Sequence, residues 1–284
     1  MQRARQQGVA LAIVVWFLAA MSLLVSGIVF QARVDIRLAQ THIAKAKAVA
    51  AGDGAIQLML AALKSKQFKS FRGRGTPTMD FAVGELPVSV LLVPTSGLID
   101  LNGASRELLA MLFSGHDNTS GVDAQLMADN VIKWRAQGRR GPGQGLRFQS
   151  IEDLLQVEGM SRALLERVRD SVAVGQSKRA GVDWLSAPPS VLAILLGRNA
   201  ARASEIVSER SGGFTANKTI PRGLSPRFQS SGSGSEYRVD AWVTVGDKIW
   251  LRRRWVSVGS GASGLLPWRF IRSEAARALP ASRI

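Results

Sequence analysis

Few residues in this chain could do catalytic or metal chemistry. It has no cysteine and only two histidines, His42 and His116, whose separation does not suit a pair of metal ligands. The lack of cysteine excludes a disulfide framework, a thiol nucleophile and a zinc–thiolate site. No pattern of serine, histidine and carboxylate indicates a nucleophile with its base. The sequence therefore predicts a protein that is not an enzyme and takes no cofactor.

One loop gathers oxygen-bearing side chains. Asp117, Asn118 and Asp123 could supply ligands to calcium, but their spacing does not match that of an EF-hand loop. We interpret this loop as a solvated turn and predict no metal site.

The charge balance is strongly basic. The 284 residues include 37 Lys and Arg against 21 Asp and Glu, a formal net charge of +16. Such a surface attracts nucleic acid, anionic lipid or acidic proteins, and the sign of the charge alone does not select among them.

The first element is an uncharged apolar run from Gly8 to Phe30, preceded by Arg3 and Arg5. As a helix it spans roughly 35 Å, enough to cross a hydrocarbon core of about 30 Å. The residues after it form a poor site for signal peptidase, so we expect the run to stay as a membrane anchor. The leading arginines favour a cytoplasmic N-terminus, although Arg33 and Arg37 beyond the run weaken that rule.

The helix is expected to continue to about residue 66, because the stretch from Gln31 has no proline and is rich in alanine. Val49, Ile56, Leu60 and Leu63 fall on one stripe that would pack on the rest of the protein. Alternation over 81–93, 237–245 and 248–258, with Gly246-Asp247 as a turn, predicts a small antiparallel sheet. Residues 261–284 are glycine-rich and basic, and we expect a flexible tail.

The middle of the chain is predicted to be helical, with a helix over 124–136 and two short helices over 150–174 that are broken at Gly159. Two segments in it resemble each other. Asp100, Ala104 and Leu109 align at one constant offset with Asp183, Ala187 and Leu192. Each segment predicts an aspartate, a capped turn and a short helix, with Asn102 or Ser105 as the first cap. A chance recurrence of helix-start residues remains the alternative.

The N-terminus resembles a type IV prepilin-like leader, in which Arg3, Arg5 and Gly8 precede the apolar helix. The resemblance implies that a prepilin peptidase cuts between Gly8 and Val9 and methylates the new amine of Val9. Most such proteins have a glutamate at mature position five, which pairs with the N-terminus of the subunit ahead. Ile13 is apolar here, and since an unpaired charge in a membrane is costly, this suits a subunit at the tip. An ordinary signal anchor is the alternative.

The rest of the chain resembles the minor pseudopilin K family of the type II secretion system. The matching stretches are RQQGVALAIVVW, LIDLNGASRELLAMLF, FQSIEDLLQVEGMSRALLERVRDSVAV, VDWLSAPPSVLAILLG and YRVDAWVTVG. The resemblance implies an α+β fold: a pilin-like long N-terminal helix packed on a small antiparallel sheet, with a large inserted all-helical domain. It implies a tip position in a periplasmic pseudopilus, in complex with other minor pseudopilins, where the protein initiates assembly and helps export folded proteins. The secreted substrates are possible further partners.

This resemblance divides the chain into parts. They are a leader (1–8), a transmembrane helix in the bacterial inner membrane (9–30), the periplasmic part of the long helix (31–66), a β region (67–97 and 213–260), the inserted domain (98–212) and the tail (261–284). One departure concerns the family's acidic stretch and calcium sites. Here Trp134 is followed by the basic run 135–140, so no calcium site is carried over and the role of the loop 135–147 stays open.

A second interpretation starts from the turn around Gly159. The stretch 154–161 resembles a helix-hairpin-helix, in which a glycine-bearing turn presents backbone amides to a DNA phosphate. With one membrane anchor and a basic surface, the chain would then be a membrane-anchored DNA receptor. Glu158 argues against this, because it brings negative charge to where the phosphate would lie.

Overall fold

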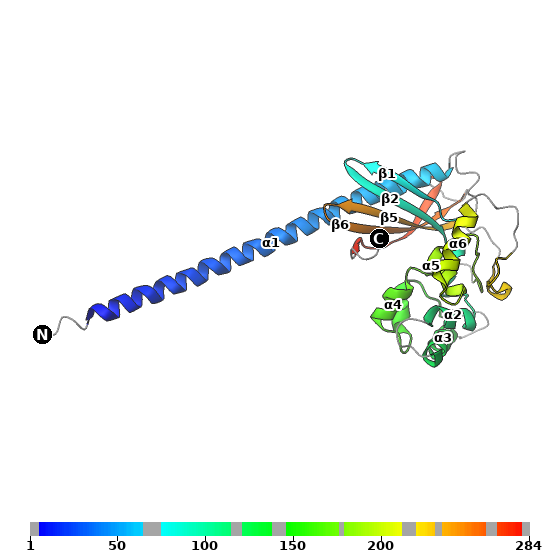
Figure 1. The fold of residues 1–284 in the computed structure, drawn as a ribbon, viewed down its shortest axis with the longest axis horizontal. Helices are drawn as coiled ribbons and strands as arrows, with labels where there is room; N and C mark the ends of the chain where they lie inside the picture. Colours follow the sequence, from blue (N-terminus) through cyan, green and yellow to red (C-terminus); the bar gives the residue numbers. More distant parts are fainter. Residues whose placement is uncertain are drawn as a thin grey trace.

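The computed structural model describes residues 6–64, 75–114, 121–137, 146–175, 179–211, 220–230, 235–259 and 266–279. A long helix extends from a head that contains a sheet and a group of shorter helices (Figure 1). The predicted α+β class is confirmed, with the long N-terminal helix packed on an antiparallel sheet. The leading residues Arg3 and Arg5 lie outside the described ranges.

The long helix α1 runs from Gln6 to Lys64 over 59 residues. It is unbroken because its sequence has no proline, few glycines, and many alanines and leucines, which are strong helix formers. Its second half packs on the sheet, where Ile56 and Leu60 are fully buried and Val49 and Leu63 are partly buried. The predicted apolar stripe is thus the contact between α1 and the head.

The sheet is antiparallel and lies across the second half of α1. Its strands follow the order β1-β2-β5-β6-β7, with β8 also paired to β6. Their bounds are Thr78–Val83 (β1), Leu86–Pro94 (β2), Glu236–Val245 (β5), Lys248–Val258 (β6), Trp268–Ser273 (β7) and Arg277–Leu279 (β8). Gly246, with φ +62°, makes the turn between β5 and β6, because this left-handed conformation is open to glycine.

The expectation of a flexible tail over 261–284 is wrong for residues 268–273 and 277–279. These residues form β7 and β8 on the outer edge of β6. The Trp268 Nε1–H donates to Gln57 Oε1 of α1 at 3.0 Å, and Phe270 packs against the same core with the Arg254 guanidinium over its ring. The packing of these aromatic side chains against α1 therefore orders the segment, although the glycine-rich residues before it suggested flexibility.

One close crossing fixes α1 on β6. A Cβ added at Gly52 would lie 2.8 Å from the Cβ of Arg252, so only glycine permits this approach. The neighbouring Asp53 accepts hydrogen bonds from the guanidinium groups of Arg252 and Arg254 at 2.8 to 3.2 Å. The helix therefore meets the sheet through a glycine and a carboxylate side by side.

The inserted domain lies between β2 and β5 in sequence and contains most of the short helices (Figure 1). Its α-helices are α2 (Arg106–Phe113), α3 (Gly121–Ala136), α4 (Arg162–Val168), α5 (Pro189–Leu195) and α6 (Ala200–Ser211). The 3-10 helix η3 (Ile151–Gln156) lies within the domain, η2 (Thr95–Gly97) directly precedes it, and η4 (Pro226–Phe228) follows it. The domain is not all-helical, because β3 (Ile99–Asp100) and β4 (Val172–Ala173) form a short parallel pair inside it. This pair is buried in the domain's own apolar core.

The two similar segments of the sequence adopt the same local structure. The carboxylate of Asp100 accepts the N–H of Asn102 at 2.9 Å, and that of Asp183 accepts the N–H of Leu185 at 3.1 Å. Both are side-chain turns that span two residues. A short helix follows each turn, α2 in the first case and α5 in the second.

A buried arginine completes each segment. Arg135 near the end of α3 donates to the carbonyl of Ala104 at 2.8 Å, and Arg210 near the end of α6 donates to the carbonyl of Ala187 at 2.9 Å. Burial lowers the pKa of both guanidinium groups to about 10, an effect that the aspartate of the same segment partly offsets. The likeness therefore extends over two helix pairs, α2–α3 and α5–α6, which favours a repeated unit over chance.

Candidate functional site

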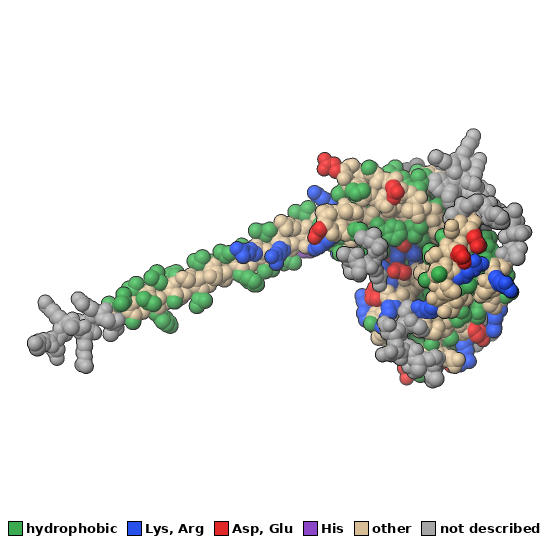
Figure 2. Space-filling view, viewed as in Figure 1, with side chains coloured by type: hydrophobic (Ala, Val, Ile, Leu, Met, Phe, Trp, Pro, Cys, Tyr) green, Lys and Arg blue, Asp and Glu red, His purple; other side chains and the backbone are tan. Residues whose placement is uncertain are grey.

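The exposed apolar part of α1 is the first candidate surface. Between Ala10 and Phe30 every residue is exposed, and Trp16 leaves 79% of its surface uncovered. By length and composition this helix can cross a membrane. Gly8 and Val9 lie in its first helical turns, and Ile13 is exposed among other apolar side chains. On the face shown in Figure 2, the coloured side chains of this part of the helix are apolar, and the first Lys and Arg side chains appear farther along the helix toward the head.

The next stretch of α1, residues 31–43, which we call the neck, joins the apolar part to the head. All its residues but Val34 are exposed, and contact with the head begins at Ala44. Val29, Ile36 and Ile43 are seven residues apart, and Ala32 and Ala39 follow at intermediate positions. Such large and small apolar residues at heptad spacing are typical of a helix that packs against another helix.

An ionic cluster lies where the inserted domain meets the sheet, on the face opposite to α1. Asp240 of β5 is 1% exposed and accepts two hydrogen bonds from the Arg253 guanidinium, at 2.6 and 2.9 Å. Arg253 also donates to Asp170, which follows α4 of the inserted domain, at 2.7 Å. Arg238 pairs with Asp240 at 3.1 Å and donates to the backbone carbonyl of Asp170. We call these four residues the seam cluster.

The seam cluster continues through a second set of pairs. Arg277 of β8 bonds to Glu166 and Asp170, and Arg169 bonds to Glu166 and Glu152. In this way carboxylates of the inserted domain are shared with guanidinium groups of the sheet. The inserted domain is therefore attached through directional charged hydrogen bonds as well as apolar contacts.

Burial and neighbouring charge act on the seam cluster in opposite directions. Burial lowers the pKa of Arg238 to about 10. For Arg253, burial lowers the pKa but the charge of Asp240 and its hydrogen bonds outweigh that effect, so the pKa is raised. For Asp170, burial raises the pKa but Arg253 outweighs it, so the pKa is lowered. All three groups are charged at neutral pH, and the cluster balances these charges locally.

Asp100 and Asn102 were expected to start a helix, but their side chains bond to the loops before α2 and around it. The Asp100 carboxylate accepts the N–H groups of Asn102 and Arg179, and burial raises its pKa. The Asn102 amide exchanges two hydrogen bonds with the backbone of Phe148, at 2.9 and 3.1 Å. The N-cap of α2 is Ser105, whose Oγ accepts the Leu108 N–H at 3.3 Å. The Asn102 side chain cannot cap, because its polar atoms are already bonded elsewhere.

Asp183 holds a comparable turn before α5. Its carboxylate accepts the N–H of Leu185 and the hydroxyl of Ser186, the latter at 2.7 Å. The residue at the N-cap position of α5 is Pro188. Asp100 and Asp183 therefore lie in corresponding places of two separate turns and do not share a site.

Gly159 is part of a turn that packs on α3. It has φ +83°, and a Cβ there would meet the Met127 side chain at 3.2 Å. The carbonyl of Glu158 accepts the Asn130 amide at 3.0 Å, and the Met160 N–H bonds to Val157. A 3-10 helix and a short α-helix flank this turn. This geometry disfavours the DNA interpretation, because the amide after the glycine is bonded internally.

The expected loop of oxygen ligands is only partly within the described residues. His116, Asp117 and Asn118 lie outside them. Within the described ranges, no group of three His, Asp or Glu side chains is placed to hold a metal ion. The seam cluster was not anticipated from the sequence, because its members come from distant segments.

No protein-family model matches the chain, and no curated protein matches it. Among solved structures, the chain is similar to one in the crystal structure of the GspK–GspI–GspJ complex of the type 2 secretion system of enterotoxigenic Escherichia coli. The two are 12% identical, the match covers 88% of this chain and 98% of that one, and the TM-score is 0.42.

Proposed function

We propose that this chain is a non-enzymatic minor pseudopilin of a type II secretion system, anchored in the bacterial inner membrane. One observation carries the proposal: a single unbroken helix exposes apolar residues over its first half and packs its second half on an antiparallel sheet. A helix of this kind can stay in the bilayer and later enter a bundle of like helices without refolding. The prepilin-like leader and the stretches resembling the pseudopilin K family support the same function.

Processing is the first step of this function. A prepilin peptidase is expected to cut between Gly8 and Val9 and to methylate the amine of Val9. The N-terminus would lie in the cytoplasm and the head in the periplasm, in keeping with the basic residues before the apolar run.

The tip position follows from Ile13 in this proposal. A carboxylate at this point would need the N-terminus of a subunit ahead as its partner, and an apolar side chain needs none. The protein would thus sit ahead of the other subunits, initiate assembly, and help folded substrates to cross the outer membrane.

The partners are proposed to be other minor pseudopilins, which would pack along the end of the apolar part and the neck. The heptad stripe of Val29, Ile36 and Ile43, with alanines between, suits a neighbouring parallel helix. Leu38 offers a matched control, since it is 54% exposed, against 57% for Ile36, but lies off that stripe. Ile36→Asp should abolish co-purification of the partners, and Leu38→Asp should not. Equal effects of the two changes would exclude the stripe as the contact.

The deciding experiment is intact-mass analysis and N-terminal sequencing of the membrane-extracted protein, with and without prepilin peptidase. A mature start at N-methylated Val9 is the expected result. A retained Met1, or cleavage after the apolar run, would overturn the proposal. For the tip position, Ile13→Glu should insert normally yet impair pseudopilus initiation, while Ile13→Leu should act as wild type. Normal initiation by the glutamate variant would count against the tip position.

A further inference from the structure

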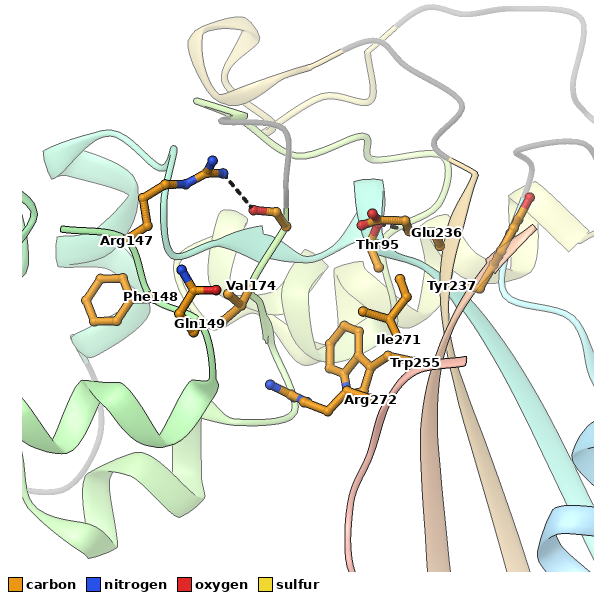
Figure 3. Close-up of a pocket in the computed structure, with 11 residues that line it drawn as sticks. Thr95, Arg147, Phe148, Gln149, Val174, Glu236, Tyr237, Trp255, Ile271 and Arg272 are labelled. Atoms are coloured by element: carbon orange, nitrogen blue, oxygen red, sulfur yellow. Dashed lines mark hydrogen bonds between the residues drawn. The ribbon is translucent and has the colours of Figure 1, made fainter. Parts of the chain in front are cut away.

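A pocket of about 400 Å³ lies between the inserted domain and one end of the sheet. Its two walls come from different parts of the fold (Figure 3). Residues 147–149 and 174–175 form the wall on the inserted domain. Thr95, residues 236–237 of β5, Trp255 of β6 and residues 271–272 of β7 form the opposite wall. The volume lies within the range of about 300 to 1,000 Å³ that is usual for ligand pockets.

The charged groups of the pocket favour an anionic ligand. Arg147 and Arg272 line it from opposite walls, and among the described lining residues Glu236 is the one acidic side chain. Arg272 bonds to Glu274 at 3.1 Å, but Glu274 also accepts the Trp255 Nε1–H. The Nε of Arg272 is covered and has no partner among the described residues. The lining residues therefore carry two guanidinium groups against one carboxylate.

The apolar groups favour a ligand that also has a hydrophobic side chain. The Arg272 guanidinium lies over the Trp255 ring, 4.8 Å from its centre, in a cation–π contact. Ile271 extends the apolar part of this wall. Glu236 would repel a polyanion, which disfavours nucleic acid, but it can accept the N–H groups of a peptide backbone. A peptide supplies all three features: a carboxylate, an apolar side chain and amide donors.

We propose that this pocket binds a short acidic peptide segment of a partner protein. One carboxylate of the segment lies against Arg272, a second lies near Arg147 on the opposite wall, and an apolar side chain between them packs on Trp255 and Ile271. Contacts of an ionised carboxylate with guanidinium groups are among the strongest polar contacts in proteins. The proposal rests on the pocket alone and does not depend on the function proposed above.

The test uses the full-length protein in detergent and a fluorescein-labelled peptide in which two aspartates flank a phenylalanine. Fluorescence polarisation should give saturable binding that weakens with salt. A matched peptide with asparagines should bind about tenfold more weakly. Arg272→Gln should cause a loss of similar size, whereas Arg269→Gln, an exposed arginine on the same strand outside the pocket, should not change the affinity.

Glu236→Gln keeps the test decisive if the Arg272 variant is poorly folded. Removing this carboxylate should raise the affinity for the acidic peptide about threefold, an effect that misfolding cannot produce. Equal binding of the acidic and neutral peptides, or no effect of either pocket variant, would overturn the proposal. So would the absence of binding at about 1 mM peptide, or competition by inorganic phosphate alone at a similar concentration, which would indicate a simple anion site.

Discussion

Replacing Asp240 by asparagine should strongly destabilise the head, because it removes the shared partner of two buried cations. Asp240 bonds twice to Arg253 and pairs with Arg238, and the side chains of these arginines are only 3% and 4% exposed. In the variant, Arg253 keeps Asp170 and Arg238 keeps a backbone carbonyl. One negative charge would then face two buried positive charges.

The size of this effect follows from the cost of leaving a buried charge without its partner. Breaking such a pair costs about 3 to 5 kcal/mol, far more than its net contribution relative to an apolar replacement. For a head of this size, 1 kcal/mol corresponds to a shift in melting temperature of about 2 to 4 °C. The Asp240→Asn variant should therefore melt about 6 to 20 °C below the wild type.

The assay is thermal unfolding followed by near-ultraviolet circular dichroism in detergent, which reports on the tryptophans of the sheet. The matched control is Asp129→Asn, since Asp129 pairs with Arg106 at an exposed site and such pairs contribute less than about 1 kcal/mol. A melting temperature of the Asp240 variant within a few degrees of that control would refute the reasoning. It would mean that water reaches the seam cluster and screens its charges.

Three further predictions concern single positions. Gly52→Ala should destabilise the protein by about 1 to 3 kcal/mol, because the added methyl group would overlap the Arg252 side chain. Gly54→Ala is the control and should be neutral or stabilising, because the nearest neighbour of its methyl group would lie at 3.5 Å. Urea unfolding compares the two variants, and equal midpoints would contradict the close crossing of α1 and β6. Asn102→Ala should cost about 1 to 3 kcal/mol by leaving buried backbone groups unpaired, and an unchanged urea midpoint would mean that water replaces the amide. Burial raises the pKa of Asp183 above its ordinary value of 3.8, so the stability it contributes is present below that pH and is lost as the pH rises through the folded-state pKa. Asp183→Asn should therefore gain stability relative to wild type as the pH rises above about 4 in melting experiments, and parallel pH profiles would exclude this role.

The long helix and the main strands could be predicted because their determinants are local. An uncharged run, the absence of proline and a stripe containing Ile56 and Leu60 define α1. The strand pattern around Gly246 defines a hairpin in the same way. In β7, Trp268 and Phe270 alternate with exposed Arg269, and this alternation could have indicated a strand despite the glycines before it.

The paired turns show where prediction from sequence ends. Asp100 and Asp183 could be aligned, because each begins a similar local motif. The arginines that complete these units, Arg135 and Arg210, could not, because they lie 31 and 23 residues beyond the alanine whose carbonyl they bind. The seam cluster and the pocket could not be predicted from the sequence either, since their residues meet only when the inserted domain has docked on the sheet.

The seam cluster also determines the width of the pocket, because it joins the two bodies that form the pocket's walls. Asp170 Oδ1 accepts hydrogen bonds from Arg253 of β6 and Arg277 of β8, at 2.7 and 3.1 Å, and these charged, directional bonds hold the inserted domain at one angle to the sheet. Asp170 itself does not line the pocket. Asp170→Asn should therefore lower the affinity for the acidic peptide by about threefold to tenfold through lost preorganisation, while the variant still folds. Asp129→Asn, within the inserted domain and away from the seam, should leave the affinity unchanged. If the Asp170 variant binds the peptide as well as the wild type does, the apolar core alone must fix the two walls, and the charged seam would then have no part in shaping the pocket.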